Sequence, residues 1–249
     1  MMPVTSSPVT AEHIRQFQQD GFFILPGILS PHDLQALRDE CQRAITEREA
    51  EMDRLGVDRL DLDHRGRRYF VHAYQHSEIV RRFLFSDLMT EIARATLGET
   101  VYLFNEQYVV KAAEQGMTFS WHQDSGFIGY PHAPYLSCWI TLDDVTEANG
   151  TVYLLPFSQA GTRDVVPHVR DERTNDMVGY TGDARGEPII APAGSIACFA
   201  STVLHRSGAN TTDRMRRVYL AQYSTEPIYL ADKTTLRHLA EPVPTGHGR

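Results

Sequence analysis

The stretch SWHQDSGF, residues 120–127, decides the expected fold because it holds a His-x-Asp pair inside a strand-like run. In a β-strand, side chains two positions apart point to the same face. His122 and Asp124 can therefore reach one point in space if residues 118–124 form a strand. A lone His-x-Asp pair is common on protein surfaces, so its meaning depends on the rest of the chain.

A second histidine, His205, follows an apolar run far along the chain and precedes a Gly-Ala-Asn turn. Two imidazoles and one carboxylate leave about three positions open on an octahedral ion, which is the pattern of non-haem iron(II) oxygenases. Zinc accepts the same ligands, so the residues alone leave the metal open. His122, Asp124 and His205 are the predicted metal ligands and catalytic centre.

Arg216 opens the strand-like run RRVYLAQYS and lies 11 residues after His205. Alternation puts it on the face of Val218 and Leu220, where a guanidinium would be a buried charge unless an anion met it. A dicarboxylic co-substrate would supply a bidentate partner. The opposite register, with Arg217 facing inward, stays open.

Short β-rich runs follow one another from residue 100 onward, separated by turn signals. They cover residues 101–111, 118–124, 135–143, 151–155, 187–190, 194–200, 202–206 and 216–224. Several short strands without intervening helices predict antiparallel sheets in a sandwich or barrel. Residues 161–186 are polar and glycine-rich and are expected to form a long loop; whether it acts as a lid stays open.

The chain before residue 98 is expected to be mainly helical. Helices are predicted from Thr10 to Gly21, from Ser30 to about Leu55 and from Ser86 to Gly98, each with a side-chain cap at its start. A short apolar strand is expected at 22–25. Since no linker or repeat divides the chain, residues 1–249 are expected to form one domain, with the helical part packed on a β core of residues 100–225.

Composition limits the class of protein. The chain has 249 residues and a net charge of −8, which makes nucleic acid and anionic membranes poor partners. No apolar run of about 18 residues predicts a membrane span, and the first residues do not resemble a signal peptide. Three cysteines without a CxxC motif indicate free thiols in a reducing compartment. We therefore expect a cytoplasmic protein with a small-molecule partner; its oligomeric state stays open.

Several ordered motifs resemble those of the phytanoyl-CoA dioxygenase family of Fe(II)- and 2-oxoglutarate-dependent oxygenases. They are FQQDGFFILPGILSPHDLQALR at 17–38, WHQD at 121–124, SCWITLDDVTEANGTVYLLPFS at 137–158, APAGSIACFASTVLHRSGAN at 191–210 and RMRRVYLAQY at 214–223. The resemblance covers nearly the whole chain. It implies a mainly β fold with flanking helices, the double-stranded β-helix (jelly-roll, cupin-like). One departure is PFSQ at 156–159, where the family often has Pro-Gly-Ser-His.

The resemblance also implies roles for individual residues. It assigns Fe(II) to His122, Asp124 and His205, and the distal carboxylate of 2-oxoglutarate to Arg216. Further positions that match residues lining the co-substrate site in the family are Lys111, Gln107, Trp139 and Ser207. A solvated Lys111 and a purely core Trp139 stay open as simpler interpretations.

The implied activity is a dioxygenase reaction. It oxidises, and most simply hydroxylates, an unactivated C–H bond of a small or medium metabolite, consuming O2 and 2-oxoglutarate and releasing succinate and CO2. Desaturation, epimerisation or ring closure in natural-product biosynthesis would use the same cofactors. Two other classes stay open: a non-catalytic metal- or metabolite-binding β-helix protein, and a zinc hydrolase, although no HExxH motif supplies the base that a hydrolase needs.

The sequence says little about the substrate. Aromatic residues near the metal motif are candidates for its pocket, and the basic turn RGRR could meet an anionic substrate, although a solvated turn explains it equally well. The candidates are Tyr102, Phe127, Tyr130, Arg67 and Arg68.

Overall fold

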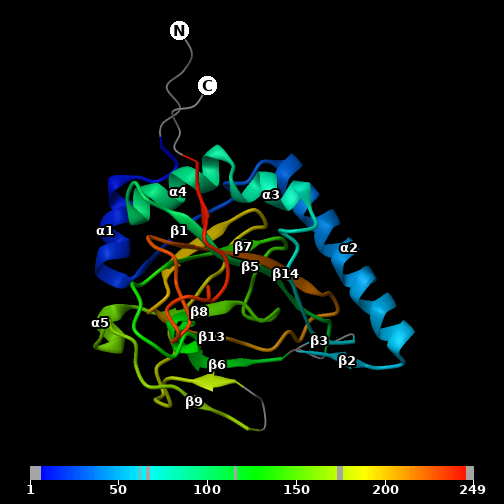
Figure 1. Ribbon diagram of the computed structural model, residues 1–249. Helices are drawn as coiled ribbons and strands as arrows, with labels where there is room; N and C mark the ends of the chain where they lie inside the picture. Colours follow the sequence, from blue (N-terminus) through cyan, green and yellow to red (C-terminus); the bar gives the residue numbers. More distant parts are fainter. Residues whose placement is uncertain (1–6, 62, 66–67, 115–116, 173–175, 245–249) are drawn as a thin grey trace.

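Two antiparallel β-sheets form the centre of the molecule, and helices cover the outer side of the larger one (Figure 1). The computed structural model describes residues 7–61, 63–65, 68–114, 117–172 and 176–244. The sequence-based expectation of a mainly β fold with flanking helices is confirmed.

The larger sheet brings together strands from both ends of the chain. Its order is β1 (Phe22–Leu25), β12 (Ile196–Ala200), β7 (Leu136–Thr141), β14 (Arg216–Ser224), β5 (Tyr102–Lys111), β4 (Arg68–Val71), β3 (Asp63–His64) and β2 (Arg59–Leu60), and β15 (Glu241–Pro242) also pairs with β5. The smaller sheet consists of β11 (Glu187–Pro188), β8 (Val152–Leu155), β13 (Leu204–Ser207) and β6 (Phe119–His122). A separate hairpin pairs β9 (Val169–Arg170) with β10 (Met177–Val178).

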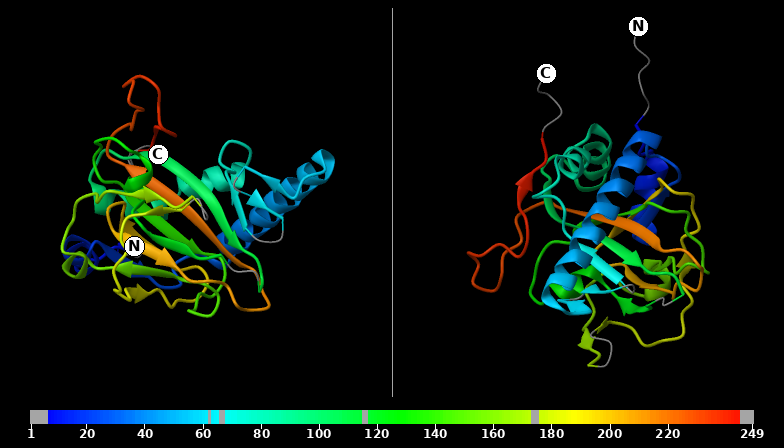
Figure 2. Two further views of the ribbon diagram at one scale, coloured as in Figure 1. Left: turned by 90° about the horizontal axis from the view of Figure 1, so that it is seen from below. Right: turned by 90° about the vertical axis from the view of Figure 1, so that its right-hand side faces the viewer.

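The helices start where the sequence supplies caps. They are α1 (Ala11–Asp20), α2 (Pro31–Leu55), α3 (Glu78–Leu84), α4 (Asp87–Leu97) and the single turn α5 (Phe157–Ala160), with a 3-10 turn η1 at Asp124–Phe127. Ser30 accepts a hydrogen bond from the Asp33 amide and Pro31 occupies the first helical position, so α2 begins as predicted. Figure 2 shows α2 lying along the outside of the larger sheet. Among the described residues, no helix is long and apolar enough to cross a membrane.

The core has two layers, and strand alternation separates them. On β14, Tyr219, Ala221 and Tyr223 pack outward beneath the helices. Val218 and Leu220 pack inward, between the two sheets. Arg216 shares the inward face of this strand by the same alternation, and its side chain is buried. The space between the sheets is therefore where functional side chains gather.

The structure departs from the expectation in its short elements. The segment before residue 98 supplies strands β1 to β4 to the larger sheet, so it contributes to the β core as well as packing on it. Helix α3 was not predicted, although Ser77 caps it. The segment 161–186 contains the β9–β10 hairpin. Strands of two to four residues show no usable periodicity, which is why the sequence does not reveal them.

Candidate active site

The predicted metal ligands meet at one end of the space between the sheets. His122 ends β6, and His205 lies directly opposite it on β13. Asp124 begins η1, two residues later. One ligand atom from each of the three residues lies within 4.8 Å of the others, and His205 Nε2 is 3.5 Å from Asp124 Oδ1. The donor set and its compactness fit a single divalent metal ion.

Each histidine is oriented by its second ring nitrogen. His122 Nδ1 lies 2.7 Å from the carbonyl oxygen of Ser120, and His205 Nδ1 lies 3.0 Å from that of Val203. These contacts fit a donating Nδ1–H and leave Nε2 for a metal. Burial, and then the proximity of His205, holds the pKa of His122 well below its usual range, which favours the neutral imidazole that metals bind.

Asp124 is held by a polar network that the sequence did not reveal. Ser137 Oγ and Gln222 Nε2 both donate to Asp124 Oδ2, the latter at 3.0 Å. Gln222 also donates to Ser137 Oγ at 3.0 Å and accepts from Asn105 Nδ2 at 3.0 Å. Because both donors to Asp124 contact the same oxygen, Oδ1 on the side of His205 remains available to a metal. One feature of the sequence could have identified Gln222: alternation along β14 puts it on the same face as Arg216.

The other end of the space holds two buried basic side chains, Arg216 and Lys111. Arg216 is 2% exposed and donates from Nη2 to the Gly150 carbonyl at 3.0 Å, while its Nε and Nη1 have no partner among the described residues. Burial lowers the pKa of Arg216 to about 10, so it stays charged at neutral pH. Its guanidinium carbon lies 5.7 Å from the ring centre of Trp139. A buried charge with two free donors fits a carboxylate.

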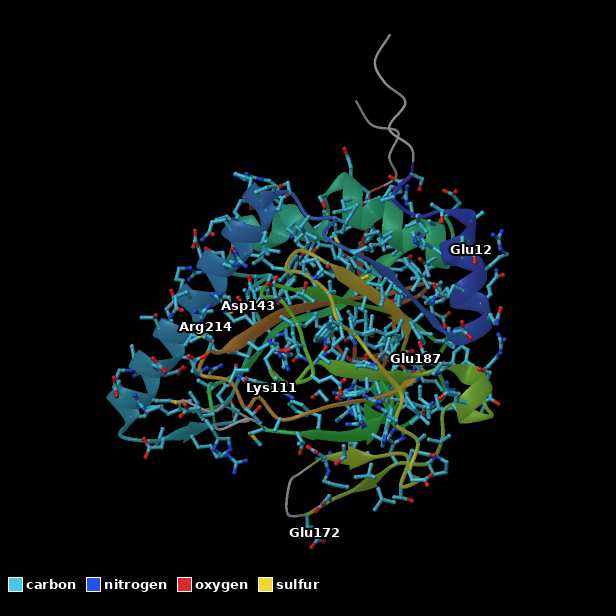
Figure 3. All side chains as sticks on the ribbon, turned by 180° about the vertical axis from the view of Figure 1, so that it is seen from behind. Glu12, Lys111, Asp143, Glu172, Glu187 and Arg214 are labelled. Atoms are coloured by element: carbon cyan, nitrogen blue, oxygen red, sulfur yellow. The ribbon has the colours of Figure 1, made fainter. Side chains whose placement is uncertain are left out.

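Lys111 lies opposite Arg216 in the β5–β14 register. It is fully buried, and its Nζ donates to Ser207 Oγ at 2.7 Å and to the Gly208 carbonyl. Burial, and then the charge of Arg216, lowers the pKa of Lys111 to about 5. Figure 3 labels Lys111 on the same side of the molecule as Asp143 and Arg214, near the start of β14. Lys111 is therefore not a solvated surface residue.

One cavity of about 570 Å³ joins the two ends. Its wall includes the three candidate ligands, and also Arg216, Gln107, Trp139, Ser207 and Phe127. Arg217, the alternative to Arg216, instead pairs with Asp143 at 2.7 Å. A cavity of this size suits a co-substrate together with a small substrate.

Some predicted residues do not reach the cavity. Strand β5 presents Asn105, Gln107 and Val109 to it, whereas Tyr102 lies beyond this row, paired with Pro242 of β15. Tyr130 packs against the small cluster around Phe104 instead of lining the cavity. Neither tyrosine lines this cavity, and a role for them in substrate binding stays a prediction.

The basic turn is only partly covered by the structure. Arg67 lies outside the described residues, and Arg68 stands in β4 opposite Lys111. Residues that the sequence analysis missed also line the cavity, notably Tyr135, Arg237 and His238. The last two come from a segment beyond β14 for which no motif was recognised.

Comparison with solved structures defines the class of fold. The chain superposes on the 2-oxoglutarate complex of EvdO2 from Micromonospora carbonacea var. aurantiaca with a TM-score of 0.67, 24% identity, and coverage of 90% of this chain and 94% of that one. It superposes on the α-ketoglutarate-dependent carbocyclase SnoK from nogalamycin biosynthesis with a TM-score of 0.70, 17% identity, and coverage of 95% and 96%. The predicted jelly-roll fold is confirmed.

The family is shown by the sequence. The family model for phytanoyl-CoA dioxygenase matches residues 17–218, and the chain belongs to this family. It is a 2-oxoglutarate-dependent non-haem iron dioxygenase. Similar proteins include the L-proline trans-4-hydroxylase of Streptomyces griseoviridis, 26% identical with coverage of 88% of this chain and 87% of that enzyme. The ectoine dioxygenase of Nocardia farcinica is 26% identical, with coverage of 97% and 85%.

Proposed function

We propose that His122, Asp124 and His205 hold Fe(II), that Arg216 holds the distal carboxylate of 2-oxoglutarate, and that the enzyme hydroxylates a small amino acid or a related zwitterion. One observation carries this proposal. A compact two-His, one-carboxylate set and a buried guanidinium with two unpartnered nitrogens line the same cavity. The first fits the metal, and the second fits the far end of a dicarboxylate that also reaches the metal.

Ser207 and Lys111 complete the co-substrate end. Because Lys111 Nζ donates to Ser207 Oγ, the hydroxyl hydrogen of Ser207 is free to point into the cavity and donate to a carboxylate. Lys111 therefore contributes through Ser207. Its lowered pKa of about 5 leaves it uncharged at neutral pH beside Arg216, and a carboxylate bound in this place would favour its protonated form.

The chain positions and shields the reactants. Bound iron and 2-oxoglutarate supply the oxidising chemistry and O2 activation. The apolar wall of Trp139, Val152, Phe199 and Leu220 excludes water from the space between the sheets. The histidines and Asp124 are held in place by their own hydrogen bonds, so the metal would find its ligands already oriented.

The substrate class is supported by the relatives. The two named above are an L-proline hydroxylase and an ectoine dioxygenase, and L-proline and ectoine are both small cyclic compounds with a carboxylate. A cavity of about 570 Å³ that also holds 2-oxoglutarate leaves room for a compound of this size. The net charge of −8 and three buried free thiols support a small-molecule enzyme that acts in the cytoplasm as one domain.

The test is an anaerobic titration of the protein with Fe(II) and 2-oxoglutarate, followed by the weak visible charge-transfer band of the chelate. We expect the band in the wild type and its loss in His205→Ala. In Arg216→Ala it should need much more 2-oxoglutarate. A wild-type protein that binds iron and 2-oxoglutarate without the band would contradict the proposal. With a substrate in hand, mass spectrometry separates hydroxylation, which adds one oxygen, from desaturation, which removes two hydrogens.

A further inference from the structure

The segment between β14 and β15 brings a second arginine to the cavity. This segment, orange to red in Figure 1, returns across the front of the two sheets. It is fixed on both sides of Arg237, because the Arg237 amide donates to the Ile228 carbonyl and the Leu239 amide donates to the Phe104 carbonyl, each at 2.8 Å. Arg237 and His238 therefore line the cavity from a defined backbone position.

Among the described residues, Arg237 has no anionic partner. Its Nη2 makes one long hydrogen bond, 3.3 Å, to the Phe127 carbonyl. Its Nε is buried and has no partner within the described part of the chain. A guanidinium held at a cavity wall with an unused buried donor is the arrangement that a carboxylate satisfies.

The surroundings of Arg237 favour an anion as well. His238 and His72 line the same cavity. Burial, and then the charges of Arg237 and His72, lowers the pKa of His238 to about 4, so at neutral pH it is an uncharged group that can donate one hydrogen bond. Arg237 and Asp124 act in opposite directions on the pKa of Tyr135, which places both charges within electrostatic range of that ring.

We propose that Arg237, with His238 beside it, binds the carboxylate of the substrate at a subsite separate from the co-substrate arginine. This inference rests on the proposed function and specifies its substrate: a small amino acid or related zwitterion. Arg216 is almost fully buried between the sheets, whereas Arg237 is partly exposed on a covering segment. The deeper guanidinium, that of Arg216, suits the co-substrate. The outer one, that of Arg237, remains for the substrate, which enters second.

A purely structural role for Arg237 is the competing interpretation. Its hydrogen bond to the Phe127 carbonyl links the segment between β14 and β15 to η1. Arg237→Gln separates the two roles. A glutamine amide can still donate to a carbonyl, but it carries no charge for a carboxylate. Arg214→Gln is the matched control, because Arg214, labelled in Figure 3, is exposed. It is not among the residues that line the cavity.

The experiment uses the anaerobic Fe(II)·2-oxoglutarate enzyme and a panel of L-proline, ectoine and the other standard L-amino acids, each beside its own carboxamide. Binding is read from the perturbed visible band and from intrinsic fluorescence, since the chain has two tryptophans and Trp139 lines the cavity. We expect at least one acid to bind ten or more times as tightly as its amide. Arg237→Gln should weaken binding of that acid at least tenfold and leave binding of the amide unchanged, and Arg214→Gln should change neither.

The inference is overturned if no acid in the panel binds more tightly than its amide, or if Arg237→Gln keeps the full preference for the acid. Formation of the band by iron and 2-oxoglutarate alone shows that the proposed function stands in such a case. If the band itself does not form, the proposed function fails instead. The comparison of acid and amide binding by fluorescence then still shows whether Arg237 binds a carboxylate.

Discussion

The two ends of the cavity differ in how many of their polar groups already have hydrogen-bond partners within the protein. At the metal end, both imidazole Nδ1 atoms meet backbone carbonyls, and Asp124 Oδ2 receives two side-chain donors. At the basic end, Arg216 has two buried nitrogens without a partner among the described residues, and the pKa of Lys111 falls to about 5. The first end is organised in advance, whereas the second is complete only with an anion.

This difference separates two kinds of stabilisation. Ligands that are already oriented lose little conformational entropy when a metal binds, so the metal end contributes affinity through preorganisation. The basic end instead holds a desolvated positive charge that destabilises the folded protein until a carboxylate pairs with it. Co-substrate binding should therefore stabilise the fold more than the number of new contacts alone suggests.

The largest expected effect is at the metal end. His122→Ala or His205→Ala removes one of three ligands. Replacing a residue that only supports a ligand typically costs about 10–100-fold in metal affinity or activity. We expect a larger fall than this in iron content and in substrate-independent succinate formation. Iron content by metal analysis and succinate release by chromatography measure the two quantities. His32→Ala, which changes an exposed histidine, is the control. Full retention of both quantities in either ligand variant would show that the metal lies elsewhere.

The next effect tests the basic end. Losing one partner of a buried charged pair costs about 2–5 kcal/mol, so Arg216→Ala should raise the KM for 2-oxoglutarate roughly 30-fold or more. Arg216→Lys should recover only part of this, because an ammonium cannot make a bidentate pair. Arg217→Ala is the control, since Arg217 pairs with Asp143 outside the cavity. A large KM effect in Arg217→Ala and none in Arg216→Ala would reverse the assignment.

A smaller effect tests whether the metal end is organised by its outer residues. Gln222→Leu removes one donor from Asp124 Oδ2, and we expect iron affinity to fall about tenfold. Asn105→Ala removes only the contact that orients Gln222, so its effect should be weaker. Anaerobic iron titration measures both dissociation constants. Wild-type affinity in Gln222→Leu would mean that the metal alone orients Asp124.

Long elements with local signals could be predicted from the sequence. Helix α2 has its Ser30 cap and Pro31, and β5 and β14 are long runs of 10 and 9 residues, so each can be recognised from its own sequence. The two-residue strands β2, β3, β9 and β10 pair with their neighbours in the chain. A strand of two residues is too short to show an alternation of apolar and polar residues, so the sequence does not reveal it.

The candidate site divides in the same way. His122, Asp124, His205 and Arg216 were identified because they stand in motifs with characteristic spacing. Ser137 stands in a recognised motif, two residues before Trp139, but the sequence does not show that it contacts Asp124. Arg237 comes from a segment without a recognised motif, whose approach to the cavity is set by long-range packing. Alternation along β14 predicts that Gln222 faces inward, on the same side as Arg216. The sequence does not show that Asp124 lies close enough to accept its hydrogen bond.

The last prediction concerns the pH dependence of stability at the basic end. The unfolded chain keeps Lys111 protonated up to its ordinary pKa of 10.5, whereas in the folded protein burial and Arg216 lower this pKa to about 5. Between these values the unfolded state binds one more proton than the folded state. The free energy of unfolding should therefore rise with pH across this window, with a contribution from Lys111 of up to about 1.4 kcal/mol per pH unit.

Lys111→Met removes that contribution, so between pH 6 and 8 the free energy of unfolding of the variant should rise less with pH than that of the wild type. Urea unfolding without added 2-oxoglutarate measures both slopes, and Lys233→Met, at an exposed lysine, is the control. Saturating 2-oxoglutarate should bring the wild type toward the variant, because a bound carboxylate keeps Lys111 protonated. Equal slopes without 2-oxoglutarate would show that Lys111 is already charged in the folded protein, so the basic end would hold two full charges and not one.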